Sequence, residues 1–232
     1  MNAVPAQADQ IFRKHHTTVR VVGRWVAAVC MAVLLSACQT AYYAAMEKVG
    51  FEKRDILSNR VEDARDAQVQ AKEEIVDALE AFSKTVNYQG GKLEAQYKSL
   101  KGHLEDSEDA AANVRKRVAD VEKVGDALFR EWRDELSKYT SADLKRRSTQ
   151  QLVQTDADYK RLIAALKKAE GRLEPALSPL RDQVLFLKHN LNARALSSLR
   201  GEVSRVDTQV DRLIADINQA VAEADSFIKG LK

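Results

Sequence analysis

Apolar residues recur at alternating steps of three and four along most of this chain, and this spacing restricts its fold more than any other feature. An average period of 3.5 residues keeps one stripe on one face of a slightly underwound α-helix. In the first helical segment the stripe consists of Leu57, Val61, Ala64, Gln68, Ala71, Ile75, Ala78, Phe82 and Val86. The same spacing continues over several heptads in each later segment, which favours packed helices over strands.

Short breaks divide the pattern into helices predicted at about residues 55–86, 92–139 and 142–189, and from 193 onward. A glycine-containing turn, a capping-box sequence and a pair of asparagines occupy these breaks. Short connections place consecutive helices antiparallel. The predicted fold class is therefore all-α, an elongated antiparallel helical bundle or coiled coil of about four long helices.

The two central helices are predicted to be longer than the two outer ones. At about 1.5 Å per residue they reach roughly 70 Å, against roughly 50 Å for the outer pair. They should therefore extend beyond their neighbours. On these two helices the predicted inward stripe includes Leu128, Tyr139 and Leu144.

Pro175 and Pro179 fall inside the third predicted helix, shortly after Gly171. Each proline removes a backbone donor and crowds the preceding turn, so we expect a kink or break at about residues 171–179. Its simplest role is structural, and a hinge is the alternative.

Charge is distributed unevenly between the start of the chain and the rest. The net charge of +3 belongs to the first 37 residues, which carry four basic residues and one acidic residue. The remainder has 33 basic and 33 acidic residues, interspersed. This balance gives no electrostatic signature of nucleic-acid binding, so we predict no nucleic-acid partner.

The first 37 residues have the organisation of an export signal. A basic stretch that ends at Arg24 precedes the apolar run WVAAVCMAVLL at residues 25–35, and small residues follow it. The run is too short to span a bilayer, which needs about 20 apolar residues. A signal anchor and a buried helix of a cytosolic protein are the alternatives.

The tetrapeptide LSAC, which ends at Cys38, resembles the lipobox of bacterial lipoproteins. The resemblance implies cleavage before Cys38, a diacylglyceryl group on its thiol and acylation of the new amine, as with palmitate. Such an anchor holds a protein at a membrane more firmly than one acyl chain does. By resemblance to enterobacterial lipoproteins, Gln39 favours sorting to the periplasmic face of the outer membrane.

These features predict three parts of the chain: a lipoprotein signal peptide at 1–37, a lipid-anchored N-terminal segment at 38–54 and a helical bundle domain at 55–232. Cys30 lies in the predicted leader and lipidation consumes Cys38, so no intramolecular disulfide is expected. The sequence holds no Cys/His cluster with metal-ligand spacing. We therefore predict no metal and no cofactor.

From residue 42 onward the chain resembles a bacterial family catalogued as domain of unknown function 2959. The stretches that carry the resemblance are MEKVGFEKRDILSNRVEDARDAQVQAKEE (46–74), LFREWRDELSKYTSADLKRRS (128–148) and RDQVLFLKHNLNARALSSL (181–199). The resemblance implies a helical, coiled-coil-like protein. Some members have a name that suggests a DNA-repair ATPase, but this sequence lacks the phosphate-binding motif G-x-x-x-x-G-K-[ST].

Few residues indicate chemistry. Carboxylates sit beside basic residues, as in the stretch 62–66 (EDARD), which is typical of a solvated helix face. The densest unusual polar group is the turn near residue 190, where Lys188, His189 and Arg194 are candidates for contact with a partner. The alternative is that they only stabilise the helix ends.

We predict a lipid-anchored envelope protein with a structural or protein-interaction role and no enzymatic activity. Its partners would be the membrane, through lipid on Cys38, and an envelope protein, with self-association as an option. One alternative is a carrier of lipid or amphipathic ligands that opens its bundle. A second is a cytosolic coiled-coil accessory to DNA metabolism, which requires Cys38 to stay unprocessed.

Overall fold

A computed structural model describes residues 52–90 and 93–231 of the chain. The predicted leader, Cys38 and Gln39 lie outside the described residues. Residues 53–232 form one compact unit, and the account below concerns this unit.

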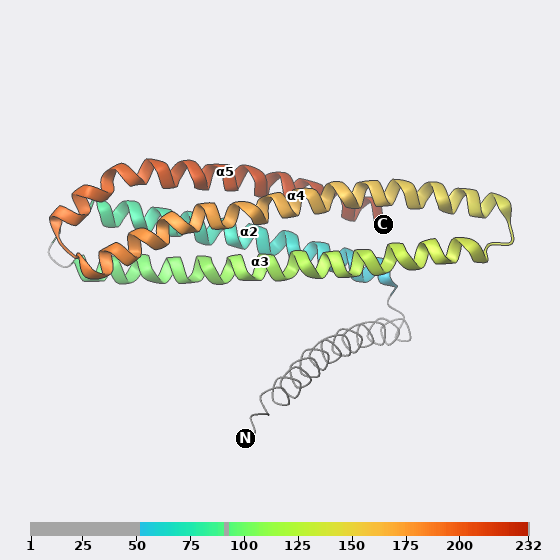
Figure 1. Cartoon of the computed structure of the whole chain (residues 1–232), viewed down its shortest axis with the longest axis horizontal. Coiled ribbons are helices and arrows are strands. Elements are labelled where there is room, and N and C mark those ends of the chain that lie inside the picture. The colour runs from blue at the N-terminus through green and yellow to red at the C-terminus, as the bar shows by residue number, and fades with distance from the viewer. Residues whose placement is uncertain (1–51, 91–92, 232) are drawn as a thin grey trace, which may run out of the picture. The chain divides into compact units, whose positions relative to one another are not determined.

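The unit is built from four long helices that lie side by side (Figure 1). They are α2 (Lys53–Val86), α3 (Leu93–Glu135), α4 (Ala142–His189) and α5 (Ala193–Leu231), and a short 3-10 helix, η1 (Leu136–Lys138), follows α3. Consecutive helices are antiparallel. Because α2 packs against both α3 and α5, and α4 does the same, the four helices close into one bundle. The predicted all-α fold class is confirmed.

The predicted apolar stripe forms the core of this bundle. All nine stripe residues of α2, including the polar Gln68, are buried. From Leu152 to Leu187 the stripe of α4 is buried apart from the half-buried Thr155. The stripe of α5 is buried except for the half-buried Val203. The period of 3.5 therefore identifies the buried face of each helix correctly.

The stripe is not buried at the end of the bundle where α3 and α4 extend beyond the other two helices (Figure 1). Tyr139 and Leu144 are 41% and 54% exposed there, so their predicted inward placement is wrong. The physical reason is that α2 begins at Lys53 and α5 ends at Leu231, and neither reaches this part of α3 and α4. We call residues 132–153 the overhang.

Three aromatic rings close the core at the base of the overhang. Tyr159 of α4 lies between Phe129 of α3 and Phe227 of α5, with ring centroids 5.0 Å and 6.1 Å away. All three side chains are buried. At this level Phe129 faces the core, while the predicted Leu128 is only half-buried. Burial among apolar groups raises the pKa of Tyr159 well above its usual range.

Helix α4 is continuous through Pro175 and Pro179, so of the kink or break predicted at about 171–179, a break is excluded. Each proline still removes one helical hydrogen bond. The loss is offset by packing, because Ala176, Leu177 and Leu180 around the two prolines are fully buried against the bundle. Tertiary contacts thus hold a helix that local rules alone would interrupt.

Two glycines of α3 should respond to alanine in opposite directions. A Cβ added at Gly125 would lie 2.3 Å from Cζ of Tyr159, whereas a Cβ at Gly102 would meet nothing within 4 Å. Since the Tyr159 ring is held between two others, Gly125→Ala should lower the free energy of unfolding by about 1–3 kcal/mol. Gly102→Ala should raise it by about 0.5–1 kcal/mol, because Ala favours helices. Urea denaturation of both variants checks this, and an equal effect at the two sites would contradict it.

Candidate functional site

The turn between α4 and α5 is built by two asparagines. At the end of α4, the Asn190 backbone N–H donates to the Leu187 carbonyl oxygen at 3.1 Å, and Asn190 Nδ2 donates to the Phe186 carbonyl oxygen at 3.0 Å. At the start of α5, Asn192 Oδ1 accepts from the Ala195 N–H at 3.0 Å and so caps this helix. Asn190 has φ −133°, which lies outside the left-handed region common at helix ends.

The predicted contact residues surround this turn and are exposed. Lys188 and His189 are the last two residues of α4, and Arg194 lies in the first turn of α5. Among the described residues, none forms an ion pair with Lys188, His189 or Arg194, nor with the nearby exposed Arg200. The turn therefore presents cations without acidic partners. Lys188 and His189 also face the negative end of the α4 dipole, so part of their role is structural.

Acidic residues are missing from the sequence around the turn. Between Asp182 and Glu202 the chain contains three Lys or Arg side chains, one His and no Asp or Glu. In a chain whose charges otherwise balance, this segment is positive. We call residues 183–201 the α4–α5 tip.

The α4–α5 tip also exposes large apolar side chains. Leu185, Phe186 and Leu191 are 59%, 41% and 37% exposed. The contact residues predicted from the sequence do not include them, although a signal exists. Residues 184–187 (VLFL) are four consecutive apolar residues, and one face of a helix buries only Val184 and Leu187 of these.

Most exposed large apolar side chains of the described residues lie near the two ends of the bundle. Tyr139, Leu144 and Val153 belong to the overhang and three more to the α4–α5 tip, while Val76 lies along the side of α2. The side walls are polar. This distribution places the candidate contact surfaces at the ends.

Ion pairs between helices cover much of the side walls. Arg181 of α4 donates to Glu108 of α3 at 2.7 Å and to Glu174 at 2.8 Å, and these carboxylates raise its pKa above the usual range, Glu174 first. Arg65 of α2 pairs with Asp225 of α5 at 2.9 Å. Several carboxylates of the walls thus pair with cations, as the sequence predicts for a solvated helix face.

One carboxylate is almost buried. Asp216 of α5 accepts from Lys168 at 2.9 Å and from Arg172 at 3.0 Å, both on α4. Its pKa lies below the ordinary value of 3.8, first because of the hydrogen bond from Lys168 and also because of the bond from Arg172. Both partners lie on one face of α4, so the cluster locks the α4–α5 register and has the character of a structural ion pair.

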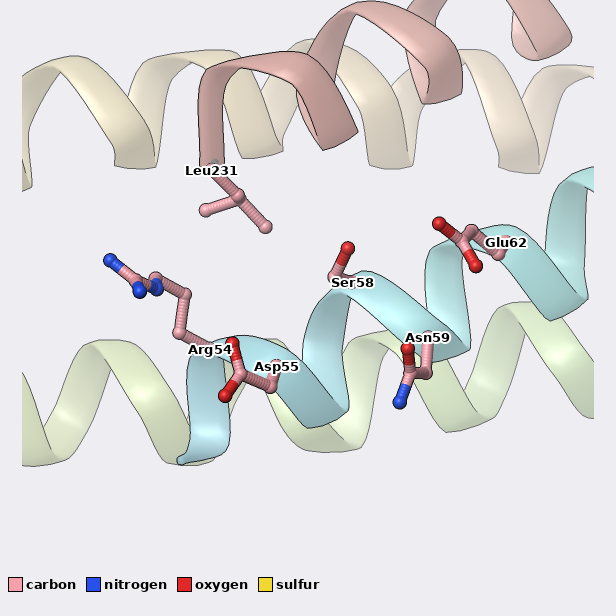
Figure 2. A pocket seen from close by; sticks show the side chains of 6 residues that line it. All are labelled: Arg54, Asp55, Ser58, Asn59, Glu62 and Leu231. Atoms are coloured by element: carbon pink, nitrogen blue, oxygen red, sulfur yellow. The ribbon is translucent and has the colours of Figure 1, made fainter. Parts of the chain in front are cut away.

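An open groove of about 480 Å³ lies where α2 begins beside the end of α5. Figure 2 shows Arg54 and Ser58 pointing towards Leu231, whereas Asn59 points away from it. The polar groups do not converge on one point, and the lining mixes one cation with two carboxylates. We assign no chemistry to this groove.

Within residues 52–90 and 93–231, no three His, Cys, Asp or Glu side chains gather closely enough to hold a metal ion. In the same part of the chain, none of the helices combines the length and apolar character needed to cross a bilayer.

Fold and surface together define an antiparallel four-helix bundle with polar walls, exposed apolar residues near both ends and a basic α4–α5 tip. The chain belongs to the family described as protein of unknown function (DUF2959), whose family model matches residues 42–231. This confirms the resemblance seen in the sequence. No curated protein matches the chain.

The Asp216 cluster should make stability depend on pH. A carboxylate with a lowered pKa stabilises the fold above its unfolded pKa, and this contribution is lost as the pH falls through its folded pKa. We therefore expect Asp216→Asn to lower the free energy of unfolding by about 1 kcal/mol at neutral pH. The difference from the wild type should shrink below about pH 4.

Urea denaturation between neutral pH and pH 3 or so measures this difference. Asp207→Asn is the matched control, because Asp207 is exposed on the same helix and has no ion pair among the described residues. A constant difference for Asp216→Asn at every pH would show that the ion pairs are not its cause.

Proposed function

We propose that this protein is a lipid-anchored component of the bacterial envelope with a structural or interaction role and no catalytic activity. It is exported, cleaved before Cys38 and held by lipid on that cysteine, with Gln39 directing it to the periplasmic face of the outer membrane. The bundle presents the α4–α5 tip to a partner in the envelope. The order of the leader, the apolar run and LSAC supports the anchor.

One observation carries the interaction role: the unpaired cations and exposed apolar residues of the α4–α5 tip lie at the end of the bundle opposite the start of α2. The Arg65–Asp225 ion pair joins the first half of α2 to the last part of α5, and Arg54 and Leu231 line one groove. The beginning of α5 therefore lies at the far end. With 34 residues, α2 spans about 50 Å. A chain anchored ahead of α2 therefore holds the tip well away from the point where the anchor joins the bundle.

The geometry gives less support to the two alternatives. A carrier that opens its bundle needs a hinge, and α4 runs through Pro175 and Pro179 without a break into two segments. An accessory to DNA metabolism needs a basic face, and the chain after residue 37 has equal numbers of basic and acidic residues.

The anchor is tested by Cys38→Ser in the full chain. We expect this variant to lose labelling by radioactive palmitate and to accumulate as the uncleaved precursor, because both steps need the thiol. Labelling and the N-terminal sequence of the wild type are measured in parallel. An unlabelled wild type with an intact N-terminus would exclude the lipoprotein.

The contact role is tested by changing Lys188, His189 and Arg194 to Gln together and crosslinking in intact cells. We expect the crosslinks of the wild type to be lost while the melting temperature stays within a few degrees, because surface substitutions change stability by about 0.5 kcal/mol or less. A lowered melting temperature with crosslinks retained would contradict the contact role. The three side chains would then only stabilise the helix ends.

A further inference from the structure

We propose that the α4–α5 tip binds the surface of a phospholipid bilayer that contains anionic lipid. This rests on the proposed function, which places the bundle in the envelope, and it names the partner that the tip contacts. The argument combines the charge of the tip, its exposed apolar side chains and the small area of the bundle end.

Charge complementarity gives the first step. Lys188, Arg194 and Arg200 are exposed, and no acidic residue lies between Asp182 and Glu202. Each of these cations lacks an ion pair among the described residues, and its segment contains no carboxylate. On the side walls, cations such as Arg65 and Arg181 are paired, and unpaired ones such as Arg212 have acidic residues close by in the sequence. Free cations beside an anionic lipid surface bind its phosphates, and each strengthens membrane binding about fivefold.

The apolar side chains give the second step. Leu185, Phe186 and Leu191 are exposed within the same segment as the cations. Interfacial membrane binding needs this combination, since apolar side chains enter the boundary between headgroups and acyl chains while cations stay among the phosphates.

The area of the bundle end decides between a bilayer and a folded protein. Four helices of about 10 Å diameter form an end about 20 Å across, or roughly 400 Å². A stable protein interface buries about 800 Å² on each partner. The bundle end is therefore too small for a standard protein interface, whereas a bilayer accepts a few inserted side chains surrounded by cations.

The test uses a lipid-free chain that begins at Gln39. It retains the bundle, because residues 53–232 form one compact unit with its own core. Binding is measured by sedimentation with vesicles of phosphatidylcholine alone and of phosphatidylcholine mixed with phosphatidylglycerol. We expect binding to the mixed vesicles and little binding to the neutral ones. Equal binding to both, or to neither, would overturn the proposal.

Two pairs of substitutions locate the contact. Lys188→Gln with Arg194→Gln should weaken binding to the mixed vesicles roughly 30-fold. The matched control is Lys116→Gln with Arg212→Gln, which removes two exposed cations from the sides of α3 and α5, unpaired among the described residues. The control should weaken binding far less. An equal loss in both double variants would indicate attraction by net charge alone and would overturn the assignment to the tip.

The apolar contribution has its own matched pair. Phe186→Ser should weaken vesicle binding several-fold, whereas Val76→Ser, a change at a similarly exposed residue on the side of α2, should not. Melting temperatures of both variants establish that the fold is intact. If Phe186→Ser bound vesicles as strongly as the wild type, this would contradict the proposed contribution of exposed apolar side chains to membrane binding.

A photoreactive side chain at position 186 of the full chain separates lipid from protein in cells. We expect lipid adducts; one discrete protein adduct would overturn the bilayer proposal. The vesicle assay does not need Cys38. A chain that fails to bind vesicles would therefore not contradict the proposed lipid anchor on Cys38. Conversely, an unlipidated Cys38 would exclude the proposed anchor while vesicle binding by the tip could still be measured.

Discussion

Burial of one apolar stripe on each of four helices is the interaction on which the rest of this bundle depends. Helices of this length gain most of their stability from packing an apolar face rather than from local propensity. Two buried polar residues of the stripe lie within hydrogen-bond distance of a neighbouring helix. Ser107 Oγ lies 2.8 Å from the Glu74 carbonyl oxygen of α2 and 2.7 Å from the His103 carbonyl oxygen of its own helix, and Gln68 Nε2 donates to the Leu166 carbonyl oxygen of α4 at 3.2 Å. A shifted register would leave the Gln68 amide group buried without this partner, so Gln68 favours one alignment of the helices.

The fold was predictable because a period of 3.5 states which face of each helix is buried. It does not state where the neighbouring helices end. Tyr139 and Leu144 continue the stripe in the sequence, yet they are exposed because α2 and α5 stop short of them. The prolines show the opposite limit. A local rule predicts a kink or break at about residues 171–179, but α4 is continuous there, and the residues around the prolines are buried against the bundle. Both differences between prediction and structure arise from contacts with neighbouring helices, which the sequence of one helix does not specify.

The candidate site was predictable in part for the same reason. A turn between two stripes must be exposed, so the sequence places Lys188, His189 and Arg194 at a surface. Which cations are paired depends on residues brought together by register. For example, Lys168 Nζ and Asp216 Oδ1 lie 2.9 Å apart in the bundle, although many residues separate them in the chain. The exposure of Phe186 could have been predicted from the sequence, because four consecutive apolar residues cannot share one face of a helix.

Polar walls and two ends of different composition suit a bundle that holds one contact, at the α4–α5 tip, at a distance from another, at the start of α2. Ion pairs such as the interhelical one between Arg181 and Glu108 lie on the walls, where charges of both signs are interspersed. The chain enters at Lys53, while the unpaired cations and exposed apolar residues of the α4–α5 tip lie at the opposite end. If the entry point is tethered by lipid on Cys38, packing along the whole length of α2 sets the distance to the tip. The stripe that determines the fold then also determines the reach of the protein, so shortening the bundle by whole heptads would move the tip without changing its chemistry.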